Sequence, residues 1–144
     1  MRPQPLILCR DIAASSRFYQ RLLGCISGHE EVEGRHSLGE YERLVAPKLH
    51  HSKWGTDGLI LQLHAWDVDH HHGPMGDPSK PIGNGVLLWF EVDDFDAAVV
   101  RARELQARVV REVHVNPDAQ HRELWIADLD GYTVVLASPD GEAT

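Results

Sequence analysis

The sequence lacks the features that mark several classes of protein. It has only two cysteines, Cys9 and Cys25, and neither lies in a CxxC pair or a metal-binding spacing. We therefore expect two buried, reduced thiols and a cytoplasmic protein, not a disulfide-stabilised one. No apolar run approaches the roughly 20 residues that span a bilayer. The first residues also lack a basic stretch followed by a long hydrophobic one, so we expect no membrane association.

Basic residues are few as well. Lys and Arg number 14 against 22 Asp and Glu, which gives a net charge of −8 and argues against a nucleic-acid partner, whose phosphates attract clustered cations. The sequence has no glycine-rich phosphate loop, no GxSxG and no HExxH, so nucleotide use and serine or zinc hydrolysis have no support. With 42% hydrophobic and 25% charged residues, the composition is that of an ordinary globular domain.

One strand–helix pattern is present and occurs twice. In residues 86–105, side chains alternate along VLLWFEV, and Asp94 then offers an N-cap for a helix with an apolar stripe. Residues 4–23 repeat this pattern roughly 80 residues earlier, with Asp11 in the place of Asp94. Each copy is followed by strands punctuated by glycine. The sequence therefore predicts two tandem modules.

Each module is predicted to contain one helix and four strands. The predicted elements of the first are a strand at 4–10, a helix at 13–23, weaker strands at 25–32 and 41–46, and a strand at 59–66. Those of the second are a strand at 86–92, a helix at 96–105, and strands at 108–114, 122–127 and 132–137, with a frayed tail from residue 138. We thus expect an α+β fold of two βαβββ modules, at about 4–66 and 85–138, joined by a linker at about 67–84. Their mixed sheets should form a concave or barrel-like cleft, with the helices outside.

These features resemble the vicinal oxygen chelate superfamily, which includes glyoxalases, extradiol dioxygenases, fosfomycin-resistance enzymes and bleomycin-resistance proteins. The resemblance rests on the doubled βαβββ pattern, the Asp-hydrophobic-x-Ala corner in each half and the DxDGY turn at residues 128–132. It implies a homodimer and, in metal-using members, four ligand positions, which here hold Gln4, Gln62, Leu87 and Val135. Two neutral amides and two aliphatic side chains lack the imidazole, thiolate or carboxylate groups that hold divalent metals, so we expect no metal and no other cofactor.

Alternation along the strands predicts which side chains face the cleft. Three of the four tryptophans fall on that face together with several polar residues, as expected of a small-molecule site. The predicted ligand-binding residues are Gln62, His64, Trp66, Trp89, Glu91, Glu123 and Trp125. Indoles stack on planar or cationic molecules, and the two carboxylates favour a positive charge. We therefore expect metal-independent sequestration of a small aromatic or cationic molecule, similar to bleomycin resistance.

Other interpretations remain open. His64, His121 and Glu123 make up the two-imidazole, one-carboxylate set of non-haem iron sites, so a lyase, isomerase or dioxygenase with a divalent metal, or with acid–base groups alone, is the enzymatic alternative. A third interpretation is an accessory domain with a vestigial cleft. His64 and His121 also fit hydrogen-bonded cavity residues, and Glu91 fits a solvent-exposed strand end. The loop histidines His70–His72, like His50 and His51, fit a solvated rim.

Overall fold

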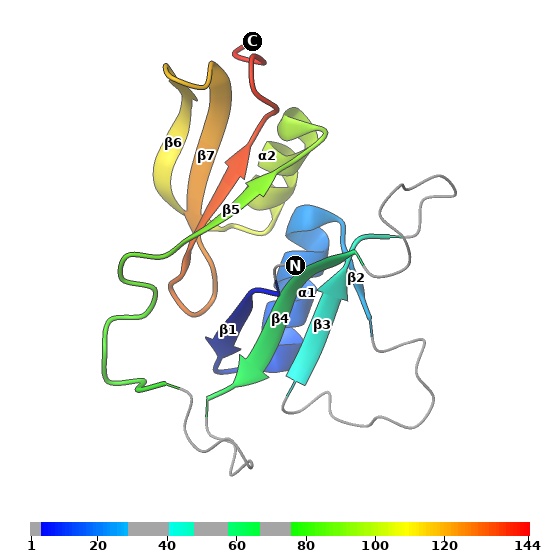
Figure 1. The fold of residues 1–144 in the computed structure, drawn as a ribbon, viewed down its shortest axis with the longest axis vertical. Helices are drawn as coiled ribbons and strands as arrows, with labels where there is room; N and C mark the ends of the chain where they lie inside the picture. The colour runs from blue at the N-terminus through cyan, green and yellow to red at the C-terminus, as the bar shows by residue number, and fades with distance from the viewer. Residues whose placement is uncertain (1–3, 29–40, 48–57, 67–75) are drawn as a thin grey trace. The chain divides into compact units, whose positions relative to one another are not determined.

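A computed structural model describes residues 4–28, 41–47, 58–66 and 76–144 of the chain. The chain divides into two compact units, residues 1–80 and 81–144, each described here by itself. Figure 1 shows that each unit consists of one sheet and one helix. The predicted linker at 67–84 lies partly outside the described residues, as do the predicted rim histidines His70–His72, His50 and His51.

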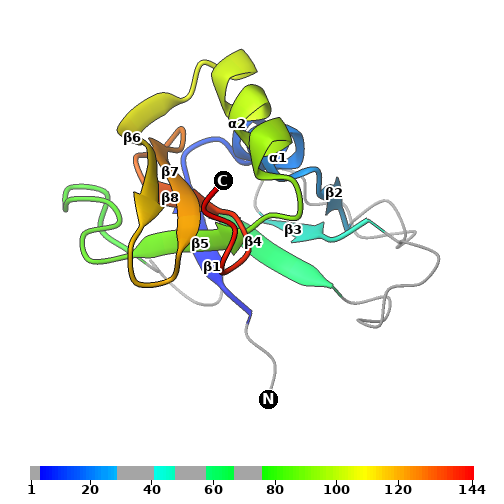
Figure 2. The ribbon, with the colours of Figure 1, turned by 90° about the horizontal axis from the view of Figure 1, so that it is seen from above.

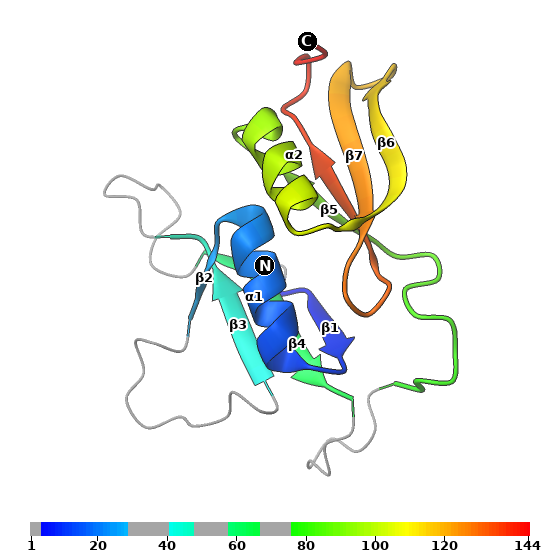
Figure 3. The ribbon, with the colours of Figure 1, turned by 180° about the vertical axis from the view of Figure 1, so that it is seen from behind.

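The first unit is a four-stranded mixed sheet with a helix on one face. Its elements are β1 (Leu6–Cys9), α1 (Ile12–Leu23), β2 (Ile26–Ser27), β3 (Tyr41–Val45) and β4 (Leu59–Ala65). The strand order is β1-β4-β3-β2, in which β1 and β4 are parallel and the other pairs antiparallel. Figure 3 shows α1 lying across its sheet.

The second unit repeats this arrangement. Its elements are β5 (Leu87–Glu91), α2 (Phe95–Glu104), β6 (Arg108–Asn116), β7 (His121–Ala127) and β8 (Thr133–Ala137). The strand order is β5-β8-β7-β6, with β5 parallel to β8. Seen from above in Figure 2, α2 covers one face of this sheet. The α+β class and the two tandem βαβββ modules are thus confirmed. The sheets are two separate, open sheets, and a cleft shared by both modules stays a prediction.

Both helices begin where the repeated aspartates predict. The Asp11 carboxylate accepts a hydrogen bond from the backbone N–H of Ala14 at 2.8 Å, and that of Asp94 accepts one from Ala97 at 2.9 Å. Each carboxylate satisfies one of the N–H groups that the first helical turn leaves unpaired. α1 ends at Gly24, whose φ of 69° is a left-handed conformation that glycine adopts without steric cost.

The core of the second unit lies between α2 and its sheet. Alternate residues of the two central strands are fully buried on this side, namely Leu124, Ile126, Val134 and Leu136. α2 contacts both strands and buries Phe95, Ala98 and Ala102. Burial of each large aliphatic side chain stabilises the fold by about 1.5–3 kcal/mol. The opposite face of the sheet therefore carries the residues in between.

One prediction of local structure was tested only in part and one was wrong. The strand expected at 25–32 is present as β2 at Ile26–Ser27, and residues 29–32 lie outside the described residues. The tail is not frayed up to Glu142. Ser138 is buried, its hydroxyl accepts a hydrogen bond from the Arg122 backbone N–H, and it donates one to the Glu142 carbonyl, both at 2.9 Å. The Gly141 N–H also donates to the Ala119 carbonyl, so the tail follows the β6–β7 turn.

Candidate functional site

The face of the second sheet opposite α2 carries most of the predicted site residues. The strand registers align its side chains in rows that cross the sheet from β5 to β6. The three rows are Leu87–Thr133–Ala127–Arg108, Trp89–Val135–Trp125–Arg111 and Glu91–Ala137–Glu123–His114, with His121 and Asn116 beside the last. We call this surface the tryptophan face. The prediction that Trp89, Glu91, Glu123 and Trp125 share one face, away from the helix, is confirmed.

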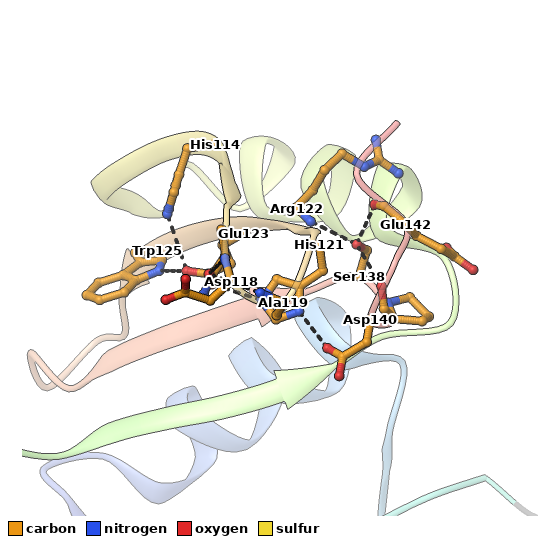
Figure 4. Close-up of polar contacts among 12 residues, drawn as sticks. His114, Asp118, Ala119, His121, Arg122, Glu123, Trp125, Ser138, Asp140 and Glu142 are labelled. Carbon is orange, nitrogen blue, oxygen red and sulfur yellow. Dashed lines mark hydrogen bonds and ion pairs between the residues drawn. The ribbon is translucent and has the colours of Figure 1, made fainter.

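Glu123 is the centre of a hydrogen-bond network on this face (Figure 4). Its carboxylate accepts hydrogen bonds from the Asn116 amide at 2.7 Å, from the Trp125 indole N–H at 2.7 Å and from the His121 Nε2 at 2.9 Å. The Nε2 of His114 lies 3.3 Å from its second oxygen. Glu123 is only 1% exposed, so these four side chains replace the water that a buried carboxylate loses.

His121 is held between two carboxylates. Its Nε2 lies 2.9 Å from Glu123 and its Nδ1 lies 2.9 Å from the Oδ1 of Asp140. A carboxylate only accepts hydrogen bonds, whereas a neutral imidazole has one N–H, so both contacts require the doubly protonated ring. The hydrogen bond to Asp140 raises the pKa of His121, burial opposes this rise, and the bond to Glu123 adds to it. His121 is therefore an imidazolium paired with Glu123.

The pKa of Glu123 is lowered from its ordinary value. Burial works to raise this pKa, but hydrogen bonds from Trp125, Asn116 and His121, together with the charge of His114, outweigh burial. Glu123 is thus an ionised carboxylate whose charge His121 balances. Its oxygens are already occupied by these contacts, and the role of Glu123 as a ligand-binding residue stays a prediction.

Two indoles and two basic side chains form the rest of the tryptophan face. Trp89 is 44% exposed, and its ring lies 5.9 Å from the ring of His121 between centroids. Trp125 is half-buried, with the Arg111 guanidinium 5.8 Å from its ring centroid and the His114 ring 6.4 Å away. Its N–H bond to Glu123 fixes the plane of the indole. Glu91, at the end of β5, is exposed, as the alternative interpretation expected.

The other predicted site residues lie in the first unit. Gln62 is bonded through both ends of its amide, since its Oε1 accepts from the Tyr41 hydroxyl at 2.5 Å and its Nε2 donates to the Gln4 carbonyl at 3.2 Å. His64 donates from Nδ1 to the Ala65 carbonyl at 2.9 Å. The indole nitrogen of Trp66 is buried and has no hydrogen-bond partner among the residues that the structure describes.

The residues of the enzymatic set belong to both units. Within the second unit the structure joins His121 and Glu123, and His64 belongs to the first unit. The sheets place Gln62 and His64 on the face opposite α1, because the fully buried Leu61 and Leu63 alternate with them.

The family's metal positions do not fit a metal ion. Gln62 already uses its amide oxygen to accept from Tyr41, and Leu87 and Val135 have no donor atoms. Among the described residues, no three His, Cys, Asp or Glu side chains form a group that could hold an ion. His121 could bind a metal only after losing a proton and one of its carboxylate partners. We therefore derive no step through a metal.

Sequence reasoning missed several residues around Glu123 and Trp125. Three of them, Asn116, His114 and Arg111, lie on the tryptophan face and the fourth, Asp140, lies in the tail. β6 shifts register twice, between Val109 and Arg111 and between Arg111 and His114, so simple alternation fails there. The bulges bring Arg111 opposite Trp125 and His114 opposite Glu123. The sequence signal that could have found Arg111 is a basic residue on a strand that pairs with a strand carrying a tryptophan.

The comparisons with known proteins agree with the predicted fold. The model of the Glyoxalase/Bleomycin resistance protein/Dioxygenase superfamily matches residues 3–136. Among curated proteins, none matches the sequence significantly. No helix in the described part of the chain is long and apolar enough to cross a bilayer.

Several solved structures share the fold. A bleomycin resistance determinant encoded on the transposon Tn5 is 16% identical, with a TM-score of 0.61 over 96% of this chain and 98% of that one. A fosfomycin resistance protein from Listeria monocytogenes is 11% identical, with a TM-score of 0.62 over 96% and 92%. A lactoylglutathione lyase from Agrobacterium tumefaciens is 16% identical, with a TM-score of 0.63 over 96% and 92%. At these identities the likeness establishes the fold alone.

Proposed function

We propose that this chain, which belongs to the Glyoxalase/Bleomycin resistance protein/Dioxygenase superfamily, sequesters a small aromatic molecule on its tryptophan face without a metal. The binding would resemble that of bleomycin-resistance proteins in kind: a ligand is held and not transformed. The observation that carries the proposal is the row Trp89–Val135–Trp125, in which two indoles stand on either side of an aliphatic residue.

The spacing of this row suits a planar ligand. Trp89 and Trp125 are two strands apart, and neighbouring strands lie about 4.8 Å from each other, so their backbones are roughly 10 Å apart. A planar ring can then contact the exposed part of one or both indoles, whereas Val135 between them is fully buried. Aromatic pairs contribute about 0.5–1.5 kcal/mol beyond the apolar area that they bury.

The Glu123 network supports binding over catalysis. Glu123 fixes the Trp125 indole and compensates His121, so its carboxylate has no free oxygen with which to take a proton from a substrate. A preorganised aromatic surface binds more tightly than a mobile one, because less side-chain entropy is lost. Because His121 balances the charge of Glu123, this carboxylate no longer favours a cationic ligand. The expectation of an aromatic ligand remains.

A panel of planar amines, alcohols and carboxylates, together with a glycopeptide, tests this proposal. Binding is detected by saturation-transfer NMR and measured by calorimetry. Trp89→Ala should weaken binding at least about fivefold, from the loss of one aromatic contact of about 1 kcal/mol. Val100→Ala, on the exposed side of α2, is the matched control and should bind like the wild type. An unchanged Kd in Trp89→Ala would remove this face as the site.

One observation favours an enzyme instead. The His121 imidazolium contacts both Glu123 and the exposed Asp140, and it could donate a proton to a bound substrate. The alternative of a lyase, isomerase or dioxygenase with His64, His121 and Glu123 adds a divalent metal to this pair. Elemental analysis of protein purified without added metal distinguishes the two. We expect no stoichiometric iron, manganese or zinc, whereas near-stoichiometric metal that is lost in His64→Ala would favour the enzyme.

We also propose that the chain is a cytoplasmic homodimer. The two cysteines are free and buried, which suits a reducing compartment. β5 is an edge strand, and a second copy of the chain could pair with its open backbone edge and leave the tryptophan face accessible. Sedimentation equilibrium tests the assembly: a monomer at all concentrations would exclude the dimer.

A further inference from the structure

We propose that the aromatic ligand carries an acidic group, a carboxylate, and that Arg111 binds this group with the help of Arg108. The inference rests on the proposed function and specifies its ligand. It reverses the charge expected from the sequence, in which Glu91 and Glu123 favoured a cation.

Arg111 is placed at the end of the tryptophan row. Its guanidinium lies 5.8 Å from the Trp125 ring centroid, and its backbone pairs with Trp125. Arg111 is exposed, and within the described residues it forms no ion pair. A guanidinium that rests on an indole keeps its N–H groups free at the rim, where they can bind a carboxylate through two parallel hydrogen bonds.

Arg108 adds a second cation on the same face. It pairs with Ala127, one row from Trp125 and Arg111, and is likewise exposed without an ion-pair partner in the described part of the chain. Arg108 and Arg111 are three residues apart, but the register shift places them opposite Ala127 and Trp125, which are two residues apart on β7 and span about 6.6 Å. Both guanidinium groups can therefore reach a single acidic group.

The acidic residues of this face do not cancel these charges. Glu123 is compensated by the imidazolium of His121 and by three further contacts. Glu91 lies on β5, three strands from β6, which is roughly 14 Å at about 4.8 Å per strand. Asp140 pairs with His121. The β6 side of the face is therefore basic, whereas Leu87 and Trp89 make the β5 side apolar.

This arrangement predicts how a ligand lies. Its ring lies against the exposed parts of the Trp89 and Trp125 indoles, and its carboxylate points along the row toward Arg111. The opposite orientation would place the anion beside Leu87 and Trp89, where the nearest cation, the His121 imidazolium, already pairs with Glu123 and Asp140. A cationic ring would instead meet Arg111 and Arg108 with like charge.

Three probes with one ring system test the inference: 2-naphthoate, its neutral methyl ester and 2-naphthylmethylammonium. Calorimetry at low salt should show that 2-naphthoate binds at least about tenfold more tightly than the ammonium compound. Arg111→Gln should weaken naphthoate binding about tenfold and leave the ester unchanged, whereas Arg111→Lys should retain part of the preference. Arg17→Gln, on the exposed side of α1, removes the same charge elsewhere and should have no effect.

The outcomes separate this inference from the proposed function. If the ester or the ammonium compound binds as tightly as naphthoate, the acidic ligand is wrong while aromatic binding stands. If Arg111→Gln binds naphthoate as tightly as Arg17→Gln does, the role assigned to Arg111 is wrong while aromatic binding stands. If none of the three probes binds at millimolar concentration, both proposals fail. The comparison of probes needs only the wild type, so a variant that does not fold leaves the test intact.

Discussion

The Glu123→Gln substitution tests the charged network on which the site geometry depends. Glu123 is 1% exposed and its carboxylate is contacted by Asn116, His114, His121 and Trp125. A glutamine supplies only one accepting oxygen. Its NH2 group is a donor and would face the N–H donors of the neighbouring side chains. Removing one partner of a buried ion pair costs about 3–5 kcal/mol, because the other charge remains buried without compensation. We expect a loss of about 3 kcal/mol in the free energy of unfolding.

The loss should depend on pH in a defined direction. The pKa of Glu123 is lowered on folding, so its contribution to stability is present above its unfolded pKa of about 4.5 and disappears as the pH falls through the folded value. The pKa of His121 is raised, so its contribution is present below about 6.5 and disappears as the pH rises through the folded value. The difference between wild type and variant is therefore largest between about pH 4.5 and 6.5.

Urea unfolding at pH 3.5, 5.5 and 9.0, followed by tryptophan fluorescence and circular dichroism, measures this difference. Comparing wild type with variant at each pH removes the contribution of the histidines that do not contact Glu123, which both proteins share. Asp140 is largely exposed, so its contact with His121 adds little at 0.15 M salt. A loss below about 0.5 kcal/mol at pH 5.5, or one that is equal at pH 5.5 and 9.0, would refute the buried ion pair.

Three further substitutions or modifications have predictable results. Leu124→Ala removes a fully buried side chain beneath α2, so the free energy of unfolding in urea should fall by about 2–5 kcal/mol. A loss below about 1 kcal/mol would mean that this core is loosely packed. Asp94→Ala removes the cap of α2 and should cost about 1 kcal/mol, and a neutral result would show that the Ala97 N–H finds another acceptor. Burial raises the pKa of the Cys25 thiol to about 11, so native protein at pH 8 should react with a disulfide reagent at this site only after urea is added; rapid native labelling would contradict its burial.

The fold was predictable because its two halves repeat one local pattern. Asp11 and Asp94 cap helices that begin within one or two residues of the predicted positions, since an N-cap depends on one side chain and the first helical turn. The Asp128 turn was likewise visible: its carboxylate accepts from the backbone N–H groups of Asp130, Gly131 and Tyr132. Short-range chemistry of this kind is encoded in a few adjacent residues.

The candidate site was predictable only where side chains alternate regularly. Trp89 and Trp125 fell on the expected face because β5 and β7 are regular strands. The two register shifts of β6 concealed Arg111 and His114 from this reasoning. The tail was misjudged because its order depends on distant partners: Asp140 meets His121, and Ser138 meets Arg122. Such contacts follow from the sheet register, which a single sequence does not specify.

The most direct test of ligand binding on the tryptophan face is an NMR titration of the indole N–H signals with 2-naphthoate, assigned through single Trp→Phe variants. The Trp125 signal reports its hydrogen bond to Glu123, and the Trp89 signal reports the exposed end of the same row. We predict that both signals shift with one common Kd, and that Arg111→Gln weakens this Kd. Signals of Trp89 and Trp125 that stay unchanged while naphthoate binds elsewhere would contradict the proposed site.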